Sequence, residues 1–114
     1  TRARNEHVAH SIAVTVVGGP TALLEWAGLR LLLDPTFDEP QRYGDHPDAL
    51  EKTSAPAVSF DALGRIDAAL VSHHHHEDNL DHRGRDLALT LPLVVTTPVG
   101  ALDLGTRGGT ARII

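Results

Sequence analysis

The sequence predicts one layered domain of the α/β (α+β) class. Two patterns lead to this prediction: short apolar strands linked by a tight turn come first, and strand-like and helix-like segments alternate afterwards. The composition agrees, because 41% of the 114 residues are hydrophobic and 22% are charged, which is the balance of an ordinary globular protein. A chain of this length can bury one modest core.

Three strands are expected in the N-terminal part. Residues 11–17 are rich in β-branched side chains and end at Gly18-Gly19-Pro20, a combination that interrupts strands. Residues 21–26 and 29–33 predict the next two strands. These two strands are separated by Ala27-Gly28, and a two-residue link that contains Gly indicates a hairpin.

Two stretches lack the pattern of a strand or a long helix. Residues 1–10 are polar and without periodicity, so we expect a flexible lead-in, with the domain at 11–114. Residues 36–59 contain several Pro, Gly, Asp and Ser residues and predict a long irregular surface loop. Ser59 is expected to open a short helical turn at 58–63.

The rest of the chain alternates between strand and helix. Strands are expected at 66–71, 93–96 and 110–114, and helices at 79–89 and 97–105. Asp78 or Asn79 is the expected N-cap of the first of these helices, and Pro98 suits the first turn of the second. The order of elements therefore favours hairpins followed by βα units.

Composition also narrows the function. The net charge is −5 and the pI is near 5.8, so nucleic-acid binding, which needs a basic surface, is not expected. Cysteine is absent, so any metal must be held by His, Asp or Glu. No apolar run reaches the roughly 20 residues that span a bilayer, and no signal-peptide core is visible, so we expect a cytoplasmic protein without membrane contact. Met is also absent, and we expect the chain to be part of a longer sequence.

A histidine cluster carries the strongest chemical signal. His73–His76 directly follow the apolar strand at 66–71, with Glu77, Asp78 and Asp81 close behind. Neutral imidazoles and carboxylates suit Zn²⁺ above all, with Mn²⁺ or Fe²⁺ as further candidates, and a loop at a strand end can place several ligands around one or two ions. Such a metal supplies a hydroxide nucleophile near neutral pH. The other interpretations are an affinity tag, which the internal position argues against, a solvated loop without metal, and a purely structural metal site.

Segments spread over most of the chain resemble one known group of proteins. From about residue 12 to 105, the sequence is similar in order to the opening hairpin (18–24), the third strand with its Asp-Pro turn (29–38), the approach to the metal loop (63–73) and the following segment (96–105) of the metallo-β-lactamase superfamily of metal-dependent hydrolases. The branch it resembles is related to ascorbate-phosphate lactonases. The resemblance implies the N-terminal half of a four-layer αββα sandwich, at residues 11–114, with a mixed sheet and helices on one face.

The resemblance also implies a set of metal ligands. The superfamily loop reads His-x-His-x-Asp-His, and its two pairs of ligands serve two metals. Two registers fit this pattern in part, and neither supplies the final histidine: His73, His75, Glu77 and Asp78, or His74, His76, Asp78 and Asn79. The branch itself reads Ser-His-Asp-His-His-x-Asp-Asn-Leu-Asp. That comparison implies that the metal ligands are His73, His75, His76 and Asp78, and that Asp78 is the catalytic residue that positions the water.

Three further residues have expected roles. His74 stands where the branch has Asp, a departure that weakens a second metal or alters proton transfer. Asp81 is expected to orient a ligand imidazole. Asp34 is expected to support the metal loop from beneath, the alternative being a plain Asp-Pro turn that ends its strand.

The remaining ligands of the superfamily, a histidine and an acidic bridging residue among them, lie in the second half of the sandwich. The chain is therefore expected to be a fragment of a longer protein, a truncated pseudo-enzyme, or a half that pairs with a second copy as a homodimer. We favour the fragment, because a half-sandwich leaves a large apolar sheet face in water and such faces drive association.

Two functions follow from these expectations. The first is a metal-dependent hydrolase, in which metal-activated water attacks an ester, lactone, phosphodiester or amide group of a small-molecule substrate. The alternative is a degenerate, non-catalytic metal-binding or interaction module of the same fold.

Overall fold

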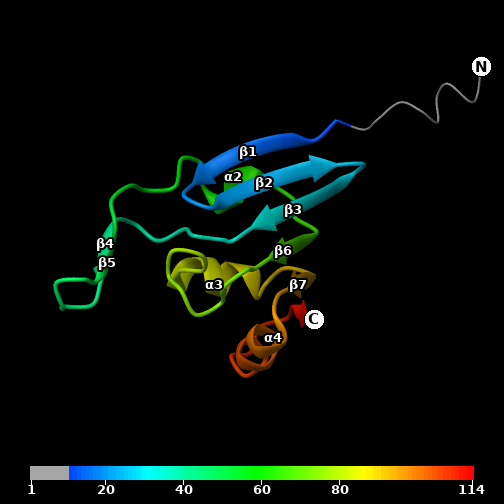
Figure 1. Ribbon diagram of the computed structural model, residues 1–114. Helices are drawn as coiled ribbons and strands as arrows, with labels where there is room; N and C mark the ends of the chain where they lie inside the picture. The colour runs from blue at the N-terminus through cyan, green and yellow to red at the C-terminus, as the bar shows by residue number, and fades with distance from the viewer. Residues whose placement is uncertain (1–10) are drawn as a thin grey trace, which may run out of the picture.

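The computed structural model describes residues 11–114, so the expected lead-in at residues 1–10 lies outside the described part of the chain. Six strands form the main sheet, in the order β1-β2-β3-β6-β7-β8, and two short strands form a separate hairpin (Figure 1). The main strands are β1 (Ala13–Gly18), β2 (Thr21–Trp26), β3 (Leu29–Leu33), β6 (Ala68–Leu70), β7 (Leu93–Val95) and β8 (Arg112–Ile113). The helices are α2 (Phe60–Leu63), α3 (His82–Ala88) and α4 (Pro98–Gly105).

The sheet is mixed, as expected. β1, β2 and β3 pair antiparallel, and β3, β6, β7 and β8 pair parallel. The turn between β2 and β3 has Ala27 at φ 50° and Gly28 at φ 83°. Two consecutive positive φ values are the geometry of a tight type I′ hairpin, so the predicted hairpin is confirmed.

The core lies on one face of the main sheet. Paired positions in neighbouring strands bring the buried side chains of Leu23, Leu32, Ala69 and Val94 into one row across the sheet. The helices α2, α3 and α4 of residues 11–114 each contribute an apolar side chain to the core cluster that contains this row: Leu63 of α2, Ala88 of α3 and Leu104 of α4. The expected arrangement, with helices on one face, is therefore confirmed.

The opposite face of the sheet carries exposed apolar side chains. Val14 and Val16 of β1 are 56% and 67% exposed, and their partners in β2 are Leu24 and Ala22. Leu29 of β3 is 46% exposed. An apolar face of this kind is what the sequence leads one to expect of half a sandwich.

The expected irregular loop at 36–59 contains a hairpin that the sequence does not predict. β4 (Gln41–Tyr43) and β5 (Leu50–Lys52) pair antiparallel and project from one end of the main sheet (Figure 1). Their strands are three residues long and largely polar, so they show no apolar alternation. Arg42 and Glu51 lie directly opposite each other in this hairpin and form an exposed ion pair at 3.7 Å.

Helix α3 begins later than expected. Its N-cap is Asp81, whose side chain accepts a hydrogen bond from the amide of Gly84, so the prediction of Asp78 or Asn79 as the cap is wrong. The residues before it form turns in which the carbonyl of His76 accepts from two following amides. Ser59 opens α2 as expected, and Pro98 lies in the first turn of α4 as expected, with Thr97 as the N-cap of that helix.

No helix among residues 11–114 combines the length and apolar character needed to cross a membrane.

Candidate functional site

The histidines lie in a loop, Ser72–Asp81, that connects β6 to α3. Asp34, at the end of β3, supports this loop from the neighbouring strand. Its carboxylate accepts hydrogen bonds from the Ser72 amide at 2.7 Å, the Ser72 hydroxyl at 2.8 Å and the Asn79 side-chain amide at 3.2 Å. Asp34 also has φ 39°, a left-handed conformation that is uncommon for a residue other than Gly. The expected role of Asp34 beneath the loop is confirmed.

Asp81 closes the loop at its other end. Its fully buried carboxylate accepts from the amides of Phe37 at 2.9 Å, Asp38 at 2.7 Å and Gly84 at 2.7 Å, and from Lys52 Nζ at 3.0 Å. Four donors satisfy the acceptor capacity of this buried carboxylate. The hydrogen bonds of Asp81 go to backbone amides and a lysine, so the expectation that it orients an imidazole is wrong.

Asp38 makes the opposite connection, from the segment after β3 to the backbone that follows the loop. Its carboxylate accepts from the amides of His82 at 3.3 Å and Arg83 at 2.8 Å, and from the Tyr43 hydroxyl at 2.6 Å. Burial alone would raise the pKa of Asp38, but these hydrogen bonds more than offset it and hold the pKa below its usual value. Burial and the hydrogen bond to Asp38 raise the pKa of Tyr43, so this phenol remains protonated and a donor.

Sequence reasoning does not find Asp38, Tyr43 or Lys52 as parts of the site. Lys52 is the single lysine of the chain, and its side chain is 17% exposed. A single lysine in an acidic chain is a candidate partner for a buried carboxylate, so its uniqueness is a weak sequence signal for this ion pair. Asp38 and Tyr43 carry no comparable signal, since the amides that donate to Asp38 lie 44 and 45 residues away and Tyr43 belongs to the unpredicted hairpin.

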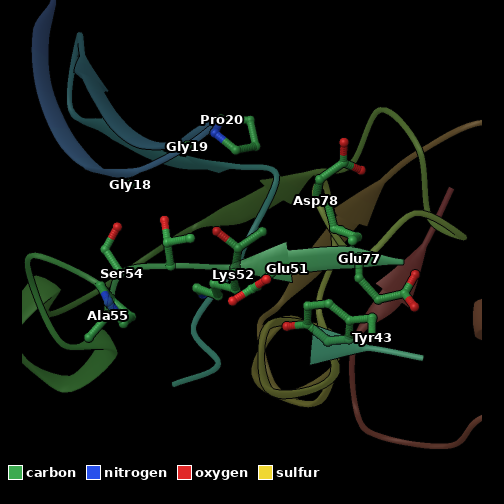
Figure 2. A pocket seen from close by; sticks show the side chains of 14 residues that line it. Gly18, Gly19, Pro20, Tyr43, Glu51, Lys52, Ser54, Ala55, Glu77 and Asp78 are labelled. Atoms are coloured by element: carbon green, nitrogen blue, oxygen red, sulfur yellow. The ribbon is translucent and has the colours of Figure 1, made fainter. Parts of the chain in front are cut away.

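Three of the four expected metal ligands have neighbouring side chains. The rings of His75 and His76 have their centroids 4.2 Å apart, and those of His73 and His76 lie 5.6 Å apart. His73 also bonds the Ser72 hydroxyl through Nδ1 at 2.9 Å. Desolvation and the neighbouring histidine charges lower the pKa of His75, which favours the neutral imidazole that metals bind. Asp78, the fourth expected ligand, is exposed and faces a pocket beside the loop (Figure 2).

The donor set of this loop fits a divalent ion in its chemistry, because it combines several imidazoles with Glu77 and Asp78. The side chains do not form a complete coordination shell. Within residues 11–114, no group of three or more His, Asp or Glu side chains has the arrangement needed to hold a metal ion. Completing the shell therefore requires rotation of these exposed side chains or ligands from outside this range.

The ring of His74 lies 4.9 Å from that of His75 and also reaches helix α4. Its Nε2 lies 3.4 Å from Asp103 Oδ2 in α4, and its side chain is only 9% exposed. Arg107 Nη2 approaches the same carboxylate at 3.6 Å. His74 therefore ties the loop to α4. Asn79, at the end of the same register, is bonded to Asp34 as described above.

A cavity of about 200 Å³ opens on one side of the loop (Figure 2). It lies between the β1–β2 turn, the β4–β5 hairpin with the chain that follows it, and the loop itself. The lining residues are Gly18, Gly19, Pro20, Thr36, Tyr43, Leu50, Glu51, Lys52, Thr53, Ser54, Ala55, Pro56, Glu77 and Asp78. We call this space the hairpin pocket.

A second cavity, of about 210 Å³, lies on the other side of the loop, against α3 and α4. His74 and Asp103 line it together with Arg85 and Arg107. Glu77 borders both cavities, so the loop forms a wall between them.

The sequence has relatives among curated proteins. Uncharacterized proteins of Mycobacterium tuberculosis and Mycobacterium bovis are 34% identical to it over 108 residues. The match includes 82% of this chain but 25% of each relative, so the chain spans about a quarter of the length of these relatives. No family model matches the sequence.

Two solved structures share the fold. One is an isothiocyanate hydrolase from Delia radicum gut bacteria, with a TM-score of 0.73 and 22% identity over 89% of this chain and 40% of the other. The second is a possible metal-dependent hydrolase from Veillonella parvula, with a TM-score of 0.73 and 19% identity over 93% of this chain and 43% of the other. The chain therefore shares the fold of an isothiocyanate hydrolase and of a possible metal-dependent hydrolase, and it corresponds to less than half of each of these two proteins.

Proposed function

We propose that this chain is the part of a metal-dependent hydrolase, of the metallo-β-lactamase type, that carries a metal-binding loop. The observation that supports the proposal is the gathering of His73, His75 and His76 in a loop that Asp34 and Asp81 hold at both ends. The fold shared with two hydrolases points in the same direction.

In this proposal His73, His75, His76 and Asp78 hold the ion. Zn²⁺ suits these ligands best, with Mn²⁺ or Fe²⁺ as alternatives, and one or two bound ions would supply the Lewis acidity that activates water for attack on the substrate. Asp78 accepts a hydrogen bond from the attacking water and fixes its direction. Asp34 and Asp81 contribute indirectly, because they hold the backbone of the loop in place.

The substrate in this proposal is a small molecule with a hydrolysable ester, lactone, phosphodiester or amide group. The likeness to an isothiocyanate hydrolase adds small isothiocyanates as reasonable assay substrates. The relatives are about four times longer than the matched region, and in this proposal the corresponding further part of the protein supplies the remaining ligands and the rest of the substrate site.

The test uses the natural full-length protein. The variant carries His73→Ala and His75→Ala together, and the control is His46→Ala, an exposed histidine at the tip of the β4–β5 hairpin. Metal content is measured by mass spectrometry, and hydrolysis with a panel of esters, lactones and isothiocyanates. We expect the double variant to lose both metal and turnover, and the control to keep both.

Two results would count against the proposal. Hydrolysis that survives in the double variant refutes the assigned ligands. A full-length protein that binds no divalent metal and hydrolyses nothing favours the alternative, a non-catalytic module of the same fold. The bond between His74 and Asp103 and the incomplete coordination shell are the features consistent with that alternative.

A further inference from the structure

We infer that the hairpin pocket binds the non-reacting part of a small substrate that carries no negative charge. The inference rests on the proposed function and narrows its substrate class, because it favours uncharged esters, lactones, amides or isothiocyanates over phosphodiesters. It depends on the charges, walls and size of the pocket.

The charges that line the pocket disfavour an anion. Three carboxylates line the pocket, from Glu51, Glu77 and Asp78. Asp78 is a proposed metal ligand, so Glu51 and Glu77 are the two left to repel an anion, and the one ammonium group in the lining is that of Lys52. Lys52 Nζ lies 3.0 Å from the carboxylate of Asp81, which is fully buried. Drawing the lysine to an anionic ligand would leave Asp81 as an unpaired buried charge, which is costly. An anion in this pocket therefore meets repulsion and no available counter-charge among its lining residues.

The walls of the pocket combine apolar side chains with hydroxyl groups. The side chains of Pro20, Leu50, Ala55 and Pro56 are apolar and lie around the pocket. The hydroxyls of Thr36, Thr53 and Ser54 add neutral hydrogen-bonding groups. Apolar surface with a few polar groups is the usual lining of a small-molecule site, and here the polar groups are mostly uncharged or acidic.

The hairpin pocket has the size of a small organic group and lies beside the histidine loop. A volume of about 200 Å³ corresponds to roughly seven waters at liquid density, which is enough for one ring or a short chain. Asp78 belongs both to this lining and to the proposed metal ligands (Figure 2). A molecule seated here therefore has one end beside the proposed reacting group.

The experiment measures binding, not turnover. Benzamide and benzoate have nearly the same shape and differ in charge, so they are the two probes, and saturation-transfer NMR is recorded on the natural full-length protein. Ala55→Trp fills the pocket, and Ala57→Trp is the matched control, because Ala57 is equally exposed but not in the lining. Only binding that Ala55→Trp removes is assigned to the pocket. For this pocket-dependent binding, we expect the dissociation constant of benzamide to be at least about tenfold lower than that of benzoate. That factor is the scale of one unscreened contact between like charges.

A charge variant tests the cause independently of pocket filling. Glu51→Lys should weaken the preference for benzamide by roughly threefold to tenfold, because it replaces a lining carboxylate with a cation. Glu39→Lys makes the same change in net charge away from the pocket and should leave the preference unchanged.

The outcomes separate this inference from the proposed function. Binding of benzamide that Ala55→Trp abolishes supports the pocket even if no hydrolysis is ever detected. Benzoate binding in the pocket as tightly as benzamide, or no benzamide binding sensitive to Ala55→Trp, overturns the inference even if hydrolysis depends on His73 and His75.

Discussion

Asp38 and Asp81 are linked in both directions, because each carboxylate accepts hydrogen bonds from backbone amides at or next to the other residue. The carboxylate of Asp81 accepts the amide of Asp38 at 2.7 Å, while the carboxylate of Asp38 accepts the amides of the two residues that follow Asp81. Two acidic side chains thus join the segment after β3 to the first turn of α3, each satisfying amides that would otherwise lack partners. This pair fixes where the histidine loop ends.

Loss of the Asp81 carboxylate should strongly destabilise the protein. Asp81→Ala removes the acceptor for three amides and leaves Lys52 without its partner, so we expect the free energy of unfolding to fall by about 3–5 kcal/mol. Urea denaturation of the natural full-length protein measures the change. Asp86→Ala, in the same helix but with an exposed side chain, should stay within about 0.5 kcal/mol of wild type. Equal effects of the two substitutions would contradict the role given to Asp81.

Gly84 allows α3 to lie close to the segment after β3. A Cβ atom at this position would lie 2.0 Å from the carbonyl oxygen of Pro35, so Gly84→Ala must push the helix away. We expect a loss of about 2–3 kcal/mol in the free energy of unfolding, typical of overpacking. The matched control is Gly105→Ala at the end of α4, where a Cβ meets nothing within 4 Å, and it should be neutral or slightly stabilising. A tolerated Gly84→Ala would show that this close approach is not maintained in solution.

Asp38 should make stability depend on pH in the acid range. Its pKa is lower in the folded protein than in the unfolded chain, where it is about 3.9. The unfolded state therefore binds more protons as the pH falls below about 4, so the stabilisation is present above that pH and is lost as the pH drops through the folded value. Thermal unfolding measured against pH should show a shallower acid slope for Asp38→Asn. An unchanged slope would mean that Asp38 does not contribute.

The β2–β3 turn holds Ala27 in a left-handed conformation. At φ 50°, an alanine is strained by its Cβ atom, whereas asparagine adopts this region more readily. Ala27→Asn should therefore stabilise the protein by about 0.5–1 kcal/mol, seen as a higher midpoint of thermal unfolding. Gly28→Ala should act in the opposite direction by about 1–2 kcal/mol, because φ is 83° there and no neighbouring atom is involved. A destabilising Ala27→Asn would rule out this turn geometry.

Much of the fold is predictable because it is encoded locally. The strands around Leu23, Leu32 and Val94 are short apolar runs bounded by Gly, Pro or Asp residues, and the Ala27-Gly28 link fits a hairpin without reference to any other part of the chain. The N-cap of α4 is equally local, because Thr97 accepts from Gly100 three residues away.

The support of the loop is less predictable because its contacts are distant in sequence. Four backbone amides that donate to Asp38 or Asp81 lie 43 to 45 positions from the carboxylate that accepts them, and no local pattern names these distant partners. The β4–β5 hairpin is missed for another reason, since its strands are too short and polar to show alternation. The sequence locates the histidine cluster but does not predict which way each side chain points. The contact of His74 with Asp103 of α4 is visible only in the folded structure.

The bracing of the loop by Asp34 has a consequence for how the protein assembles. The bonds from Asp34 to Ser72 and Asn79 join residues 38 and 45 positions apart, at the ends of the paired strands β3 and β6. Contacts that span so much sequence are slow to form, because loop closure costs entropy before any contact repays it. A partly folded or newly synthesised chain therefore carries four adjacent histidines on an unsupported loop. We expect the bonds of Asp34 to form late in folding, and pulse-labelled hydrogen exchange of the Ser72 amide during refolding should report when they form.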